Sequence, residues 1–319
     1  MTRFQMLAIT TVIATLVLVA IGAIVRTTGS GLGCPDWPLC HGQWHPPAEK
    51  TAIIEYSHRT AAAIVGVLVM ATVYVALHYH WRDATLRWLS IASLPLLGFQ
   101  ALLGRETVER ELPPEVVTFH LATAMVLLAV LALIAGFAFL GANRARNDVG
   151  DRSRVLRLAA AGAAVTFLVV LSGAYVVGEN ATAACTSWPG CSEAQVPFVD
   201  GTWEQSIHWL HRFIVVGGLV AVAGVAAALL RLHDGSPLLR RTAWLLVGLY
   251  GAQILVGASN IWTDFSEVSR VSHLALGAMI WTLMVLVAVA GRYHPGLPDD
   301  APATAARTSR SGDSAATRV

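Results

Sequence analysis

The sequence is poor in charged residues: Asp, Glu, Lys and Arg make up 13% of its 319 positions, against about 25% in soluble domains. Apolar residues make up 55%, and the mean hydropathy is +0.60. A water-soluble fold is excluded, because too few polar side chains are present to cover its surface. The net charge of +2 is not gathered into a basic face, which excludes a nucleic-acid partner. Four cysteines are too few for a disulfide-built scaffold.

The sequence contains eight long apolar runs with few charged residues. A helix crossing about 30 Å of hydrocarbon needs about 20 apolar residues. The sequence therefore predicts an all-α integral membrane protein with eight transmembrane helices in a lipid bilayer. Pro95 and Gln100 make the third run the weakest. The predicted spans are 6–25, 57–78, 86–104, 118–141, 155–178, 208–231, 241–259 and 271–291.

The two ends of the chain differ in character. The run 6–25 follows Arg3, as a signal peptide would. It is longer than a signal core of about 7–15 residues and lacks a small-x-small cleavage site, so we expect it to remain as a helix. Residues 293–319 contain no apolar run and predict a disordered tail.

The distribution of basic residues predicts the orientation. With the N-terminus inside, 15 of the 22 Lys and Arg residues lie on the inner side. We therefore expect both termini in the cytoplasm of a bacterial cell, and the long connections 26–56 and 179–207 outside.

The two halves of the sequence share motifs in register. C-x-x-W-P-x-C occurs at 34–40 and again 151 residues later, at 185–191. Further matches, offset by 153 residues, pair His58-Arg59 with His211-Arg212, Gln100 with Gln253, Gly104 with Gly257, and His120 with His273. We expect two pseudo-symmetric four-helix bundles related by an axis along the membrane normal. Their predicted bounds are 1–141 and 155–292, joined by a cytoplasmic linker at 142–154.

One histidine begins each even-numbered span: His58, His120, His211 and His273. All four are expected near the outer face, because these spans run from outside to inside. Two imidazoles at matched depth on neighbouring helices can ligate a haem iron from both sides. The alternatives are interfacial anchoring and a zinc or copper site, which two histidines leave incomplete. His208 competes with His211 as a ligand, and the repeat register favours His211.

Charged residues beside these histidines suggest further roles. Arg59 and Arg212 are candidates to meet haem propionates or, equally, lipid headgroups. Glu55 precedes His58 by three residues and shares its helix face, whereas the second half has His208 at that offset. Glu55 is either a proton acceptor and cation stabiliser or an acid favoured by the helix dipole. The difference suggests that one half does chemistry and the other holds a permanent cofactor.

The cysteines lie in the two long outer connections, within an oxidising compartment. We therefore predict disulfides Cys34–Cys40 and Cys185–Cys191. Their role, structural or redox-active, stays open.

The chain resembles the haem A synthase family in several runs. These are GAIVRTTGSGLGCPDWPLCHG (22–42), EYSHR (55–59), TFHLATA (118–124), IHWLHR (207–212) and VSHLALG (271–277), together with the second cysteine motif. The resemblance implies an oxidoreductase that converts haem O to haem A by oxidising a ring methyl, at C8, to a formyl group through successive hydroxylations. The product supplies cytochrome oxidase.

Site roles follow from this resemblance residue by residue. It implies that His58 and His120 bind the substrate haem in the N-terminal half, and that His211 and His273 ligate a haem b cofactor in the C-terminal half. Glu55 matches the family's catalytic carboxylate. The resemblance also implies functional partnership with haem O synthase; a homo-oligomer is compatible with the sequence.

Three other classes of protein compete with this interpretation. A two-haem b-type electron carrier usually has haems near both membrane faces. A thiol oxidoreductase acting through the loop cysteines gives no reason for the duplicated histidines. A transporter fits the repeat but predicts no haem.

Overall fold

The computed structural model describes residues 1–141, 145–146, 151–191, 198–231 and 237–294. Within these residues, eight helices are long and apolar enough to cross a membrane, which confirms the predicted all-α membrane fold. They are α1 (Arg3–Thr27), α2 (Lys50–Tyr79), α3 (Ala84–Glu109), α4 (Pro114–Leu140), α5 (Asp151–Gly178), α6 (Trp203–Leu230), α7 (Pro237–Trp262) and α8 (Glu267–Arg292). Two short strands, β1 (Ala145–Arg146) and β2 (Tyr293–His294), pair antiparallel. The disordered tail was predicted from residue 293, which is wrong for Tyr293 and His294, since they form β2. From residue 295 on, the tail lies outside the described residues.

The helices extend beyond the predicted spans because their ends carry polar residues that hydropathy does not count. Thr2 and Thr202 begin α1 and α6 with capping boxes, in which the hydroxyl accepts from a backbone N–H of the first turn. Helix α2 begins at Lys50, seven residues before the predicted start at 57. Helix α3 runs unbroken through Pro95, where the sequence looked weakest.

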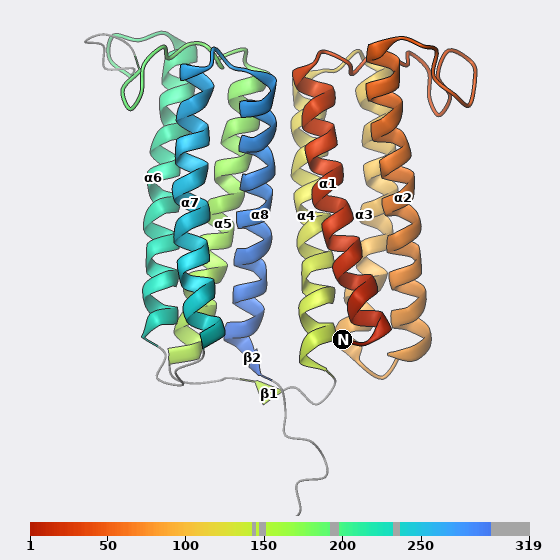
Figure 1. The fold of residues 1–319 in the computed structure, drawn as a ribbon, viewed down its shortest axis with the longest axis vertical. Helices are drawn as coiled ribbons and strands as arrows, with labels where there is room; N and C mark the ends of the chain where they lie inside the picture. Colours follow the sequence, from red (N-terminus) through yellow and green to blue (C-terminus); the bar gives the residue numbers. More distant parts are fainter. Residues whose placement is uncertain (142–144, 147–150, 192–197, 232–236, 295–319) are drawn as a thin grey trace, which may run out of the picture.

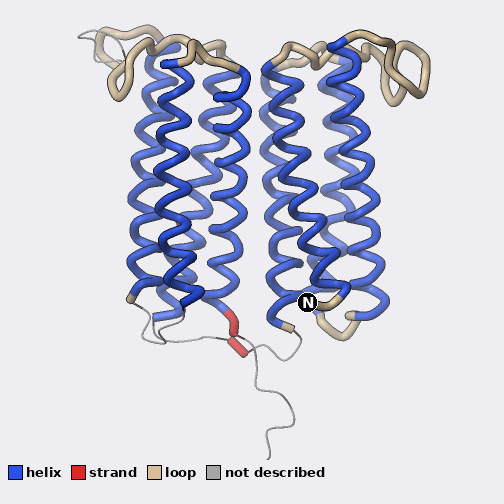
Figure 2. Tube along the Cα trace, viewed as in Figure 1, coloured by secondary structure: helices blue, strands red, loops and turns tan. Residues whose placement is uncertain are grey.

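The helices stand in two groups of four, α1–α4 and α5–α8 (Figures 1 and 2). In the first group α1 contacts α2 and α4, and α3 contacts the same two helices. In the second group α5 contacts α6 and α8, and α7 contacts the same two. Helices α2 and α4 therefore lie diagonally across one bundle, and α6 and α8 across the other.

The two bundles meet along α1 and α4 on one side and α5 and α8 on the other. A single cluster of buried apolar side chains spans both bundles, and includes Leu131, Ile134 and Met284. The indole N–H of Trp281 in α8 donates to the backbone oxygen of Met125 in α4 at 3.0 Å. In the first turn of α8, Arg270 donates to the oxygen of Thr27 at the end of α1. The halves are thus packed together as one body.

Candidate functional site

The four histidines lie at one end of the bundles, where the long loops after α1 and α5 are found (Figure 1). His58 and His211 come eight residues after the first residue of their helices, and His120 and His273 six. At 1.5 Å per residue, these positions are about 9–12 Å along the helix, rather than at its start as the sequence predicted. Each pair also lies on diagonal helices, not on the neighbouring helices we expected. Diagonal helices direct the pair toward the bundle interior.

Each imidazole packs against a glycine of the preceding helix. A methyl group on Gly257 would come within 2.9 Å of Cε1 of His273, and one on Gly22 within 3.1 Å of Cε1 of His58. At Gly22, Gly173 and Gly257 a methyl group would crowd the ring, whereas at Gly104 it would lie 3.8 Å from Cε1 of His120, an ordinary contact. The four pairs are His58 with Gly22, His120 with Gly104, His211 with Gly173 and His273 with Gly257.

Two glutamines brace the helices that carry the second histidine of each pair. The amide of Gln100 in α3 donates to the oxygen of His120 at 3.3 Å and to the hydroxyl of Thr123. The amide of Gln253 in α7 donates to the oxygen of His273 at 2.9 Å. These bonds hold the histidine-bearing turn of α4 and of α8 against its neighbour.

The imidazole nitrogens have few protein partners. The ring centroids of His211 and His273 are 6.5 Å apart, with the planes inclined at 79°. Nδ1 of His211 pairs with the hydroxyl of Ser172 at 2.8 Å. Nδ1 of His58, of His120 and of His273 is buried without a hydrogen-bond partner among the described residues.

Glu55 is buried, with 3% of its surface exposed, and both carboxylate oxygens have partners. One oxygen accepts from the guanidinium of Arg59 and the other from the backbone N–H of Cys34 at 2.8 Å. The same guanidinium donates to the backbone oxygens of Cys34, Asp36 and Leu39 at 2.6–2.8 Å. Arg59 and Glu55 therefore tie the first cysteine loop to α2, one turn from His58.

Arg212 makes the matching contacts in the second half. It donates to the backbone oxygens of Ser187, Pro189 and Gly190 in the second cysteine loop. His208, which stands where the first half has Glu55, pairs through Nδ1 with the oxygen of Ala181 at 3.1 Å. His208 is thus engaged with the loop, while His211 lies against Gly173.

Both predicted disulfides are present, as Cys34–Cys40 and Cys185–Cys191. All four cysteines are buried, with at most 3% of their surface exposed. The first loop is also held by Asp36, whose carboxylate accepts from the backbone N–H of His41 and of Gly42. The hydrogen bond from Gly42 lowers the pKa of Asp36 below its usual value.

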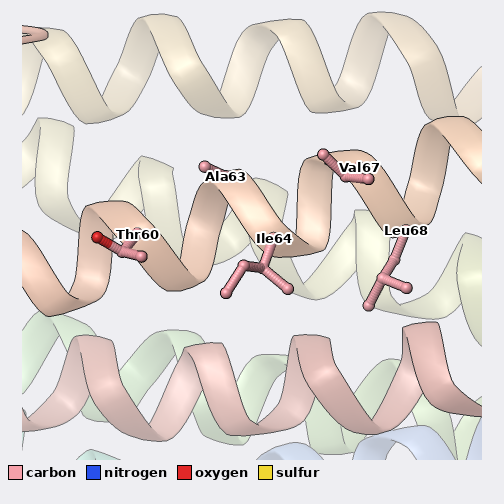
Figure 3. A pocket seen from close by; sticks show the side chains of 5 residues that line it. All are labelled: Thr60, Ala63, Ile64, Val67 and Leu68. Atoms are coloured by element: carbon pink, nitrogen blue, oxygen red, sulfur yellow. The ribbon is translucent and has the colours of Figure 1, made fainter.

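A shallow, open apolar depression of about 320 Å³ lies on the surface of α2, and Figure 3 shows its lining side chains on that one helix. It begins two residues after His58 and leads away from the loops. Its surface suits hydrocarbon chains. It is lined by Thr60, Ala63, Ile64, Val67 and Leu68.

Several residues of this region were missed by the sequence analysis. Gly22 and Gly173 share the 151-residue offset of the cysteine motifs, so a longer register comparison would have found them. Ser172 aligns with Ile21 in that register, so the repeat did not mark it as a site residue. Arg59 and Arg212 were expected beside haem propionates or headgroups; their bonds to the loops were not foreseen, and a propionate contact stays a prediction.

The chain is similar to known proteins over most of its length. Residues 5–53 and 48–285 match the family COX15-CtaA, described as cytochrome oxidase assembly protein. A protein named "Heme A synthase" from Geobacillus thermodenitrificans is 28% identical, over 90% of this chain and 92% of its own. Others with that name, from Symbiobacterium thermophilum and Alkalihalophilus pseudofirmus, are 30% and 31% identical over 82% and 88% of this chain, and 87% and 95% of theirs. The chain belongs to the COX15-CtaA family.

Proposed function

We propose that this protein is a haem A synthase, a multi-pass membrane oxidoreductase that converts haem O to haem A. Family membership over most of the chain supports this activity. The observation that carries it at the site is the imidazole pair, repeated in both bundles at one depth, with each ring against a glycine. The oxidation turns one ring methyl into a formyl group through successive hydroxylations.

A haem fits the imidazole pairs in three respects. The ring centroids of His211 and His273 are 6.5 Å apart, close enough for both rings to bind one metal ion between them. Nδ1 of His58, of His120 and of His273 is buried without a hydrogen-bond partner among the described residues, so each of these rings has a nitrogen that the protein does not engage. Among those residues, no group of three or more His, Cys, Asp or Glu could hold a metal ion, and a porphyrin supplies the ligands that two histidines lack.

We assign different roles to the two halves. His58 and His120 bind the substrate haem O, and His211 and His273 bind a resident haem b. The assignment rests on Glu55, a buried carboxylate one turn from His58, where the second half has His208. When bound, haem b supplies one-electron redox chemistry. The bundles would then serve as catalytic and electron-relay halves.

Glu55 is the proposed catalytic residue. Its negative charge lies in a buried site and is balanced by Arg59, so it favours positive charge that develops on the adjacent substrate. Hydroxylation of the methyl carbon by water releases two protons and two electrons. Glu55 would accept a proton, and the electrons would leave through the haem b half to a one-electron acceptor. Arg59 and the N–H of Cys34 hold the carboxylate in position for this transfer.

We also propose the orientation and the setting of the enzyme. Both termini lie in the cytoplasm of a bacterial cell, because the basic residues gather on that side. The histidines then lie toward the outer face. Haem O synthase is the proposed supplier of substrate, and haem O, with its prenyl tail, would arrive through the lipid. A homo-oligomer is compatible with this arrangement.

Two competing functions are less well supported. A carrier without chemistry gives no reason for a buried Glu55 in one half alone. A thiol oxidoreductase needs an accessible sulfur, and all four cysteines are buried in disulfides.

The test is to purify the protein from cells that make haem O and to identify the extracted haems by mass. Haem A or a hydroxylated haem O is the expected result. Haem b alone would favour an electron carrier, and the absence of any haem would overturn the proposal.

A further inference from the structure

We propose that Ser172 is a positioning residue for the haem of the C-terminal half: its hydroxyl holds His211 in the tautomer and orientation that ligate iron. The inference rests on the proposed function, because it assigns Ser172 a task in the haem site of His211 and His273. Ser172 lies in α5, next to Gly173, against which the ring of His211 packs.

The two contacts of the Ser172 hydroxyl favour one position for the proton of His211. A hydroxyl carries one hydrogen, and that of Ser172 is donated to the backbone oxygen of Val169 at 2.9 Å. The oxygen of Val169 can only accept, whereas Nδ1 of His211 can donate or accept, so we assign the hydroxyl hydrogen to Val169 and let Ser172 accept from Nδ1 across 2.8 Å. The proton of the neutral ring is therefore on Nδ1, and Nε2 keeps its lone pair.

This arrangement suits a haem ligand. A histidine that binds metal through one nitrogen usually donates the other N–H to an acceptor, which fixes the ring and makes it a stronger electron donor. Stronger donation favours ferric over ferrous iron. We therefore expect Ser172 to tighten haem binding and to lower the reduction potential of the haem in this half.

The contact distinguishes His211 from the other three histidines. In the described structure Nδ1 of His58, His120 and His273 is buried without a partner. The residues that precede the four packing glycines explain the difference, since three of them are apolar. They are Ile21, Leu103, Ser172 and Val256. The chain thus supplies a hydroxyl at one of four matched positions, in the half assigned to the permanent cofactor.

The experiment compares Ser172→Ala with Ser172→Thr in the full-length, haem-loaded protein. Removal of an acceptor that supports a metal ligand typically costs 10–100-fold in affinity. We expect Ser172→Ala to bind haem b at least about tenfold more weakly than the unmodified protein, as measured by transfer of haem to a competing apoprotein. Its haem b should also show a higher reduction potential in spectroelectrochemistry. Ser172→Thr keeps the hydroxyl and should keep both properties near those of the unmodified protein.

Two further variants complete the test. Ser93→Ala removes a buried hydroxyl that donates to the oxygen of Ser90 in the same way, but touches no histidine. It should leave haem affinity and potential unchanged. Ile21→Ser places a hydroxyl at the position matching Ser172, and should shift the spectrum of haem O bound at His58.

The outcomes separate this inference from the function on which it rests. Equal haem affinity and potential in Ser172→Ala and the unmodified protein would overturn the role of Ser172 and leave the enzyme assignment intact. An unmodified protein that binds no haem would overturn the proposed function itself.

Discussion

Glu55 has two tasks in the structure, since the carboxylate proposed for catalysis also accepts the backbone N–H of Cys34. Replacement by alanine would remove both, and a loss of activity would not distinguish them. Glutamine keeps the size of the side chain and an oxygen acceptor for that N–H, but carries no charge. The charge itself is therefore the quantity to test.

We predict that Glu55→Gln forms haem A at least about 100-fold more slowly, in the range typical of a lost general base. The reason is that a neutral amide neither accepts the proton nor favours positive charge. Mass analysis of haems extracted from membranes that supply haem O measures the effect.

The matched control for this variant is Glu109→Gln. Glu109 also pairs with an arginine one turn away, Arg105, but it is exposed at the last residue of α3. It should make normal amounts of haem A. Normal haem A in Glu55→Gln would refute the catalytic role.

At the scale of elements, the site depends on how closely odd and even helices approach. Glycines of α1, α3, α5 and α7 lie under the imidazoles of α2, α4, α6 and α8. Lipid tails are as apolar as the helices, so the hydrophobic effect does not hold transmembrane helices together. They associate through close packing, which small residues allow. The helix contact and the orientation of the ring are thus produced by the same glycine.

We predict that Gly257→Ala lowers the haem b content of the purified protein by about tenfold, as for a displaced ligand. The added methyl would lie 2.9 Å from Cε1 of His273 and push the ring aside. Alanine is a better helix former than glycine by about 1 kcal/mol, so a weaker helix would not explain the loss. The loss is measured as the amount of haem b per protein chain, from the absorbance of its pyridine complex.

Gly251→Ala in the same helix serves as the control, because nothing lies within 4 Å of its added methyl. Its haem content should equal that of the unmodified protein. If Gly257→Ala also retained all its haem b, the packing of His273 on Gly257 would be irrelevant to ligation.

At the scale of the whole molecule, the two bundles share an apolar core but keep their histidine pairs apart. Each pair lies on diagonal helices of its own bundle. The contacts between bundles, such as Trp281 with Met125, join other positions of α4 and α8. Each bundle should therefore load its haem with little dependence on the other.

We predict that His58→Ala retains haem b and fails to make haem A, whereas His211→Ala loses most of its haem b. The physical reason is that each substitution removes one axial ligand from one bundle and leaves the other pair untouched. Haem extraction and mass identification on both variants provide the measurement. Loss of haem b from His58→Ala alone would contradict the assignment of the two halves.

The eight membrane helices, both disulfides and the family were predicted correctly from the sequence. Apolar runs, the spacing of cysteines and the order of motifs are properties of neighbouring residues, so they are visible without a fold. The spans were predicted too short where polar residues extend a helix, as at Lys50 in α2. The roles of Glu55 and of the four histidines stay predictions.

The sequence by itself determined how many helices cross the membrane and which of them carry histidines. Only the tertiary structure decided that the histidine helices are diagonal, that Arg59 and Arg212 hold the cysteine loops, and that Ser172 bonds to His211. Hydropathy shows which part of each helix lies in the membrane, but it says little about which helices are neighbours. Packing of small residues and a few buried hydrogen bonds select that arrangement, and they join residues far apart in the chain.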